Sequence, residues 1–121
     1  MANVRTLDWG KSYITFDGLK SVGEKRIHSE GENEINPHKM IPLHQHLNDT
    51  EEYTTLSTGL KIIVIPAEDL ENLNDEEVLN MLKKQKRLLV GEKVICPKGY
   101  AHALYNASST IGRFNFCKYF D

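Results

Sequence analysis

The feature that most constrains the fold is a series of short strand-like runs separated by turn residues. Runs rich in β-branched and aromatic residues recur along the chain, and Gly, Pro or Asp-Gly closes most of them. We expect turn material at 31–33. Many short strands with tight turns favour an all-β sandwich or barrel over a parallel α/β sheet. The expected strands lie at 13–16, 25–28, 38–46, 52–58, 61–65, 88–90, 92–96, 102–105 and 113–120.

One segment departs from this pattern and predicts a helix. Acidic residues open it at 75–77 and basic residues close it at 83–87, which complements the helix dipole. Asn74 or Asp75 can serve as the N-cap. We expect one amphipathic helix of about three turns, which covers an edge or rim of the β-structure or, alternatively, binds a partner. Its apolar stripe consists of Val78, Leu79, Met81 and Leu82.

Length and composition fit one globular domain without a strong charge bias. The chain has 121 residues, of which 40% are hydrophobic and 26% charged, with a formal net charge of -2. This balance favours neither nucleic acid nor an acidic membrane surface as a partner. The longest clearly apolar run, 62–65, is too short to span a membrane, and the N-terminus does not resemble a signal peptide. We therefore expect a cytoplasmic protein. Cys96 and Cys117 are expected to be inert buried thiols, and the alternative is that the two lie close to each other.

The histidines suggest a metal site. His38, Met40, His44 and His46 share one face of the expected strand 38–46 if that strand runs unbroken through Pro42. Two further groups complete a set with this histidine pair: Glu52, at the start of the next expected strand, and His102, which follows a Pro-x-Gly turn. Three imidazoles and one carboxylate suit Mn, Fe, Co, Ni, Cu or Zn, whereas Ca and Mg prefer all-oxygen ligands.

Two strings of the sequence resemble the conserved motifs of the cupin superfamily. Residues 91–106 (GEKVICPKGYAHALYN) fit the second motif, G-x5-P-x-G-x2-H-x3-N, without a mismatch. Residues 44–59 (HQHLNDTEEYTTLSTG) resemble the first motif, G-x5-H-x-H-x3-4-E-x6-G. The resemblance implies a single domain over 1–121, with the first motif at about 38–59, a helical insert at about 68–87 and the second motif at 91–106.

The resemblance also implies a fold, a site and an assembly. The fold is an all-β jelly-roll barrel with one short helical insert between the motifs. The site is one divalent transition metal inside the barrel, near one mouth. Asn106 would fix a turn, and the protein would form a homodimer. By position the implied metal ligands are His44, His46, Glu52 and His102.

The first motif departs from the family pattern at two points. His38 stands where the motif has its glycine, and the loop after His46 is one residue too long for Glu52. Glu51 satisfies the spacing after His46 but misses the spacing to Gly59. We prefer Glu52, because the six residues to Gly59 are counted along an expected strand, where parity is fixed. Glu51 stays open as the alternative.

The motifs predict a metal site more firmly than a reaction. The first hypothesis is a small metalloenzyme of the dioxygenase, isomerase or lyase type, which uses Fe, Mn, Ni or Zn on a small polar substrate that chelates the metal through oxygen. His38 is then the candidate acid–base helper. The alternative is a non-catalytic small-molecule binding or sensor protein that uses the metal as a docking point. In either case the expected partners are a small molecule and a second copy of the chain, without nucleic acid or membrane.

Overall fold

A computed structural model describes residues 3–120, with only the backbone described at residues 70 and 71. Nine strands account for most of the described chain, and two short helical segments lie between the sixth and seventh strands. In chain order the elements are β1 (Asn3–Leu7), β2 (Gly10–Val22), β3 (Lys25–Ile35), β4 (Met40–Gln45), β5 (Thr50–Thr55), β6 (Leu60–Pro66), η1 (Ala67–Asn72), α1 (Asp75–Lys83), β7 (Lys93–Cys96), β8 (Tyr100–Asn106) and β9 (Gly112–Phe120).

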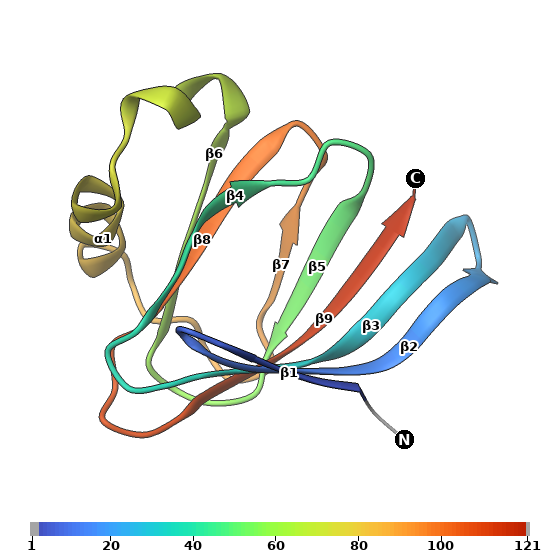
Figure 1. Ribbon diagram of the computed structural model, residues 1–121, viewed down its shortest axis with the longest axis horizontal. Coiled ribbons are helices and arrows are strands. Elements are labelled where there is room, and N and C mark those ends of the chain that lie inside the picture. The colour runs from blue at the N-terminus through green and yellow to red at the C-terminus, as the bar shows by residue number, and fades with distance from the viewer. Residues whose placement is uncertain (1–2, 121) are drawn as a thin grey trace.

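The strands form two antiparallel sheets that face each other across the core. The larger sheet has the order β1-β2-β3-β9-β5-β7, and the smaller has the order β4-β8-β6. Figure 1 shows the smaller sheet on the left and the larger on the right. Both sheets contribute to one buried cluster, in which Ile41, Leu60 and Leu104 of the small sheet meet Tyr53 and Phe114 of the large one. The expected all-β architecture with one short inserted helix is therefore confirmed.

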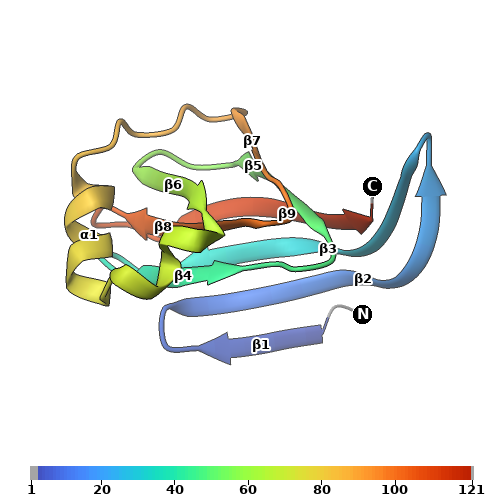
Figure 2. The same ribbon diagram turned by 90° about the horizontal axis from the view of Figure 1, so that it is seen from above.

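The helix α1 covers the outer face of the small sheet, on the side away from the large sheet (Figures 1 and 2). The Asn74 side chain caps it by accepting a hydrogen bond from the Glu77 backbone N–H at 2.8 Å. Val78 and Leu82 are buried against a second cluster that includes Ile63 of β6. The helix is shorter than expected, because the basic residues from Lys84 onward lie outside it. No helix among residues 3–120 has the length and apolar character needed to span a bilayer.

Two expected boundaries in the large sheet are wrong. The turn expected at 31–33 lies inside β3, where Gly31 permits close packing: a Cβ there would lie 2.1 Å from the Tyr13 carbonyl oxygen. The strand expected at 13–16 extends on both sides to form β2 and continues through Asp17-Gly18 with register shifts. These changes join several short expected runs into long strands.

At the start of β4, the side chains do not alternate between the two strand faces in the way that was expected for 38–46. The pairing of β4 with β8 shifts register between Ile41 and His44, at Pro42, which has no backbone N–H to donate to the ladder. Ile41 therefore faces the core between the sheets, whereas Met40 packs on the cluster beneath α1. His38 lies before the strand, in a turn with a φ of 60°. The expectation that His38 and Met40 share the face of His44 is wrong for this reason.

Candidate metal centre

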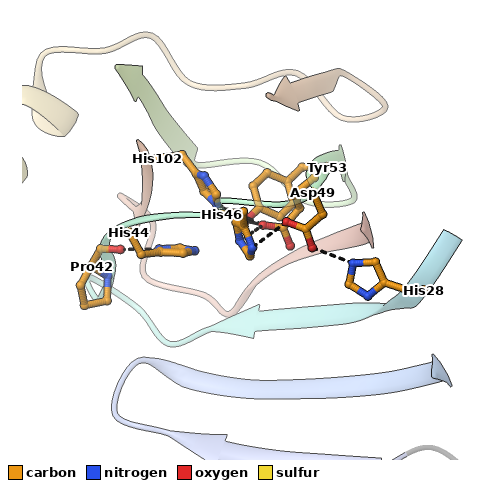
Figure 3. Close-up of polar contacts among 8 residues, drawn as sticks. His28, Pro42, His44, His46, Asp49, Tyr53 and His102 are labelled. Carbon is orange, nitrogen blue, oxygen red and sulfur yellow. Dashed lines mark hydrogen bonds and ion pairs between the residues drawn. The ribbon is translucent and has the colours of Figure 1, made fainter. Parts of the chain in front are cut away.

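Three histidines and one glutamate converge between the two sheets. Each offers one nitrogen or oxygen atom, and these four atoms all lie within 4.8 Å of one another. The register of β4 with β8 places His44 directly opposite His102, and their ring centroids are 4.2 Å apart. His46 follows at the end of β4, with its ring stacked 5.3 Å from that of His102 (Figure 3). The carboxylate comes from Glu51 of β5.

The carboxylate in this group is Glu51, and the preference for Glu52 is corrected. Residues 51, 53 and 55 of β5 are buried, whereas Glu52 points to the other face of the sheet. There its carboxylate lies 3.1 Å from Lys25 Nζ and 3.6 Å from Lys93 Nζ. The preference failed because β5 ends at Thr55, so the residues before Gly59 are not all counted along a strand.

His38 is not part of the group. Its side chain is exposed in the turn before β4, and its backbone N–H donates to the Asn106 carbonyl at 3.0 Å. The proposed acid–base role of His38 rested on a shared strand face with His44, and the turn removes that basis. Asn106, in contrast, lies where the resemblance implies. Its buried amide donates to the carbonyls of Ile35 and Thr110, and so fixes the turn after β8.

Polar contacts at Nδ1 orient two of the imidazoles. His44 Nδ1 lies 2.8 Å from the Pro42 carbonyl oxygen, which only accepts, so Nδ1 carries the proton and Nε2 keeps its lone pair. His46 Nδ1 lies 3.1 Å from Asp49 Oδ1. The second oxygen of Asp49 lies 2.6 Å from His28 Nε2, as Figure 3 shows. Sequence reasoning missed Asp49 because it occupies a position that the first motif leaves unspecified, and it missed His28 because β3 brings this residue in from outside both motifs.

Tyr53 is a further residue that the sequence analysis did not assign. Its hydroxyl donates to Glu51 Oε1 at 2.6 Å, and its oxygen lies 2.8 Å from His102 Nε2. His102 Nε2 is also 3.1 Å from Glu51 Oε1. The alternation along β5 would have found Tyr53, because it is two residues from Glu51 and shares its face. It holds the glutamate in place beside His102.

The surroundings set the charge of each member. Burial raises the pKa of Glu51, but contacts with His102 and His46 outweigh this and hold that pKa well below its ordinary value of 4.5. Burial lowers the pKa of His44, so its imidazole is neutral at pH 7. Contact with Glu51 raises the pKa of His46. Burial raises the pKa of Tyr53 well above 10, which keeps its phenol protonated. The group thus offers one carboxylate anion and a neutral His44.

The residues fit a bound cation on two observations. His102 Nδ1 is buried and has no hydrogen-bond partner among the described residues, and His46 Nε2, also buried, makes no well-aligned hydrogen bond although it lies 3.1 Å from Glu51 Oε1. Buried polar atoms are nearly always satisfied, so such lone pairs call for a further binding group. The donor set of three imidazoles and one carboxylate is also the set that first-row transition metals prefer. This group of side chains could therefore hold a metal ion.

The two cysteines lie on opposite faces of the large sheet and are both free thiols. Cys96 pairs with Glu51 on the inner face, and burial raises the pKa of its thiol to about 12. Cys117 pairs with Glu52 on the outer face and is half-buried. Cys96 therefore matches the expected inert buried thiol, and the two cysteines do not form a disulfide.

No protein-family model and no curated protein matches the sequence. Solved structures, however, share its fold. The cupin domain of Cnp3 from Schizosaccharomyces pombe aligns with a TM-score of 0.66 at 12% identity, covering 98% of this chain and 69% of that one. A predicted oxalate decarboxylase from Thermotoga maritima aligns with a TM-score of 0.64 at 14% identity, covering 100% and 93%.

A third similar structure is an uncharacterized conserved protein with a double-stranded β-helix domain from Klebsiella pneumoniae. It aligns with a TM-score of 0.64 at 11% identity and covers 95% of this chain and 80% of that one. Similarity at such low identity establishes the architecture and leaves the activity to be argued from the site. The chain therefore has the same fold as these small cupin and double-stranded β-helix domains.

Proposed function

We propose that this protein is a small metalloenzyme of the dioxygenase, isomerase or lyase type, which binds one divalent transition metal through His44, His46, Glu51 and His102. The observation that carries the proposal is the convergence of these four side chains, two of them with buried ring nitrogens that make no hydrogen bond among the described residues. Fe, Mn, Ni and Zn all suit this donor set. The bound ion would supply Lewis acidity, or an open position where a small molecule chelates through its oxygen atoms.

The chain's own residues would prepare this centre. The Pro42 carbonyl and Asp49 hold the Nδ1 atoms of His44 and His46, so Nε2 of each ring, which in His46 lies 3.1 Å from Glu51 Oε1, is the atom that would face the ion. Tyr53 donates to Glu51 and so fixes the orientation of the one anionic ligand. A small oxygen-rich acid as the substrate would agree with the name of one structural neighbour, the predicted oxalate decarboxylase.

A second candidate is a non-catalytic binding or sensor protein with the metal as docking point. One observation favours it: Tyr53 and Asp49, the titratable groups that touch the proposed ligands, already bond to ligand side chains. Among the described residues His38 offers no replacement as a base, because it is exposed outside the group. This candidate predicts stabilisation by a small molecule without turnover.

The test of the proposed site is elemental analysis of protein purified without added metal, followed by Mn²⁺ titration of the wild type and of His102→Ala. We expect one ion per chain in the wild type and loss of that ion in the variant, with the far-UV spectrum retained. Because His102 is fully buried, His46→Ala serves as a second variant at a less buried position. A wild type that binds no transition metal would contradict the proposal.

Turnover separates the two candidates. Metal-loaded protein that converts a small chelating acid, and loses that activity with His102→Ala and with a chelator, supports the enzyme. Stabilisation alone supports the binding protein. The homodimer and the cytoplasmic location stay predictions, and sedimentation of the purified chain tests the first of them.

A further inference from the structure

A cavity of about 130 Å³ lies beside the candidate metal centre. Three residues of the centre, His44, Glu51 and Tyr53, form part of its wall. The large sheet supplies other wall residues from three strands, with Arg5 on β1, Asn33 on β3 and Lys118 on β9. A molecule in this cavity would therefore touch the centre and the large sheet at once. Leu7, Trp9 and Ile41 add apolar surface between them.

The two cations of this cavity lack carboxylate partners. Neither Arg5 nor Lys118 makes an ion pair with any residue between 3 and 120. Lys118 sits opposite Glu51 in the register of β5 with β9, close enough to lower the pKa of that glutamate without forming an ion pair. Two cations that line one cavity and make no ion pair are suited to bind an anion from outside.

The outer face of the same sheet shows the contrast. There Lys20 pairs with Glu30 at 2.5 Å, and Arg113 pairs with Glu32 at 2.6 Å. Lys25 pairs with Glu52 at 3.1 Å. The sheet thus supplies an ion-pair partner to each of these three outer cations, whereas Glu51, the carboxylate of the cavity wall, forms no ion pair with Arg5 or Lys118.

Asn33 adds a third recognition element. Its side chain is buried, at 9% exposure, and lines the cavity. Its Oδ1 has no hydrogen-bond partner among the described residues. An unsatisfied buried acceptor is costly unless a donor reaches it, and a ligand hydroxyl would be such a donor.

The volume limits the size of the ligand. A water molecule occupies about 30 Å³ of liquid, so the cavity has room for roughly four waters. That space suits an acid of about two to four carbons, and a sugar phosphate or a nucleotide would extend beyond it. The apolar side chains between the two ends would contact its short carbon chain.

We propose that this cavity selects short-chain carboxylates, which reach the metal centre and also place a carboxylate against Arg5 and Lys118. The inference rests on the proposed function for the metal contact, while the cationic end, defined by Arg5 and Lys118, stands on the large sheet alone. Lys118 lies opposite Glu51, so this end adjoins the metal centre. Arg5 and Lys118 are its specificity residues, and Asn33 favours acids that also carry a hydroxyl group.

The test measures binding of three diacids (oxalate, malonate and succinate) by calorimetry, with malonamide as a neutral analogue of malonate. Each is titrated into Mn²⁺-loaded and metal-free wild type. We expect at least one diacid to bind the loaded protein, and malonamide to bind at least about tenfold more weakly than malonate. In Arg5→Gln combined with Lys118→Gln, we expect diacid affinity to fall at least about tenfold in both forms.

The matched control is Arg113→Gln, which removes a paired cation from the outer face and should leave diacid affinity unchanged. Metal stoichiometry is measured for every variant before the diacids are added. A variant that keeps its metal but loses the diacid supports the cationic end. Equal binding of malonate and malonamide, unchanged affinity in the double variant, or no diacid binding to either form would overturn the inference. If the wild type takes up no metal, the proposed function fails. Diacid titrations of the metal-free protein then test the role of the cationic end by themselves.

Discussion

Glu51 and Glu52 are neighbours in β5, yet their carboxylates have opposite surroundings. Glu51 is 3% exposed and meets His46, His102 and the Tyr53 hydroxyl between the sheets. Glu52 points to the outer face, where Lys25 and Lys93 neutralise it. The difference arises from strand alternation alone, because successive side chains point to opposite faces. A shift of one residue decides whether a carboxylate belongs to a surface ion pair or to the candidate metal centre.

The cross-strand neighbours of the two glutamates repeat the contrast. Glu51 lies opposite Cys96 and Lys118, and Glu52 lies opposite Ile95 and Cys117. On the outer face the glutamate pairs with exposed lysine side chains, and solvent screens this interaction. On the inner face it has imidazoles, which become good metal ligands when they are neutral. The inner carboxylate is therefore the one that gains most from a bound cation.

The largest expected effect separates the two glutamates by metal affinity. Glu51→Gln should weaken Mn²⁺ binding by at least about a hundredfold, because it removes the anionic ligand of the group. Glu52→Gln should change the affinity by less than about twofold, since its side chain faces away. Competition titration with a chelating dye measures both. Equal losses of Mn²⁺ affinity in the two variants would contradict the distinction between the inner and the outer glutamate.

A smaller effect is expected for the residue that orients His46. Asp49→Asn weakens the acceptor at His46 Nδ1, and we expect metal affinity to fall about tenfold. The same titration measures it, with His28→Gln as the companion variant because His28 touches only the other oxygen of Asp49. If His28→Gln lowers metal affinity as much as Asp49→Asn, the contact between His28 and Asp49 also supports metal binding. Unchanged metal affinity in Asp49→Asn would contradict the orienting role of Asp49.

Acid sensitivity of the metal-free protein tests the inner carboxylate in another way. The pKa of Glu51 is below its ordinary 4.5, so its ionised form stabilises the fold above that pH, and this stabilisation is lost as pH falls. The raised pKa of His46 acts in the opposite sense: its contribution is present below 6.5 and is lost as pH rises through the raised value.

We therefore expect the wild type to lose about 1 to 2 kcal/mol of unfolding free energy between pH 5 and pH 3 through Glu51, on the scale of a charge-assisted hydrogen bond. Glu51→Gln should lose much less over the same range, whereas Glu52→Gln should follow the wild type. Urea unfolding in the presence of a chelator gives the free energies. The same dependence of unfolding free energy on pH in all three proteins would contradict this prediction.

The smallest expected effect concerns the outer glutamate. Glu52→Gln removes contacts with two lysines whose side chains are 46% and 67% exposed, so its cost to stability should be only about 0 to 1 kcal/mol. The cost should shrink further in 1 M salt, which screens surface charges. Urea unfolding at low and high salt measures it. A cost well above this range would mean that the outer face is less solvated than its exposure indicates.

Several elements could be predicted because local physics decides them. The helix at α1 follows from its charge order and from Asn74 as its cap, and β6 follows from its run of β-branched residues. The histidine pair and His102 stood out through motif spacing, and the structure brings them together. These predictions depend on residues that lie close together along the chain.

Other features of the site depended on tertiary contacts, which the spacing of residues along the sequence does not reveal. The choice of Glu51 required knowing that β5 ends at Thr55, and the exclusion of His38 required the register shift in β4. Asp49 and His28 meet only because β3 and the loop before β5 come together.

The sequence by itself determined an all-β chain with one inserted helix and three histidines in positions typical of a cupin metal site. Only the tertiary structure decided which carboxylate joins them, and that Arg5, Asn33 and Lys118 line one cavity beside them. The physical reason is that parity along a strand changes at every bulge and strand end, and the packing of two sheets, more than local propensity, sets those points.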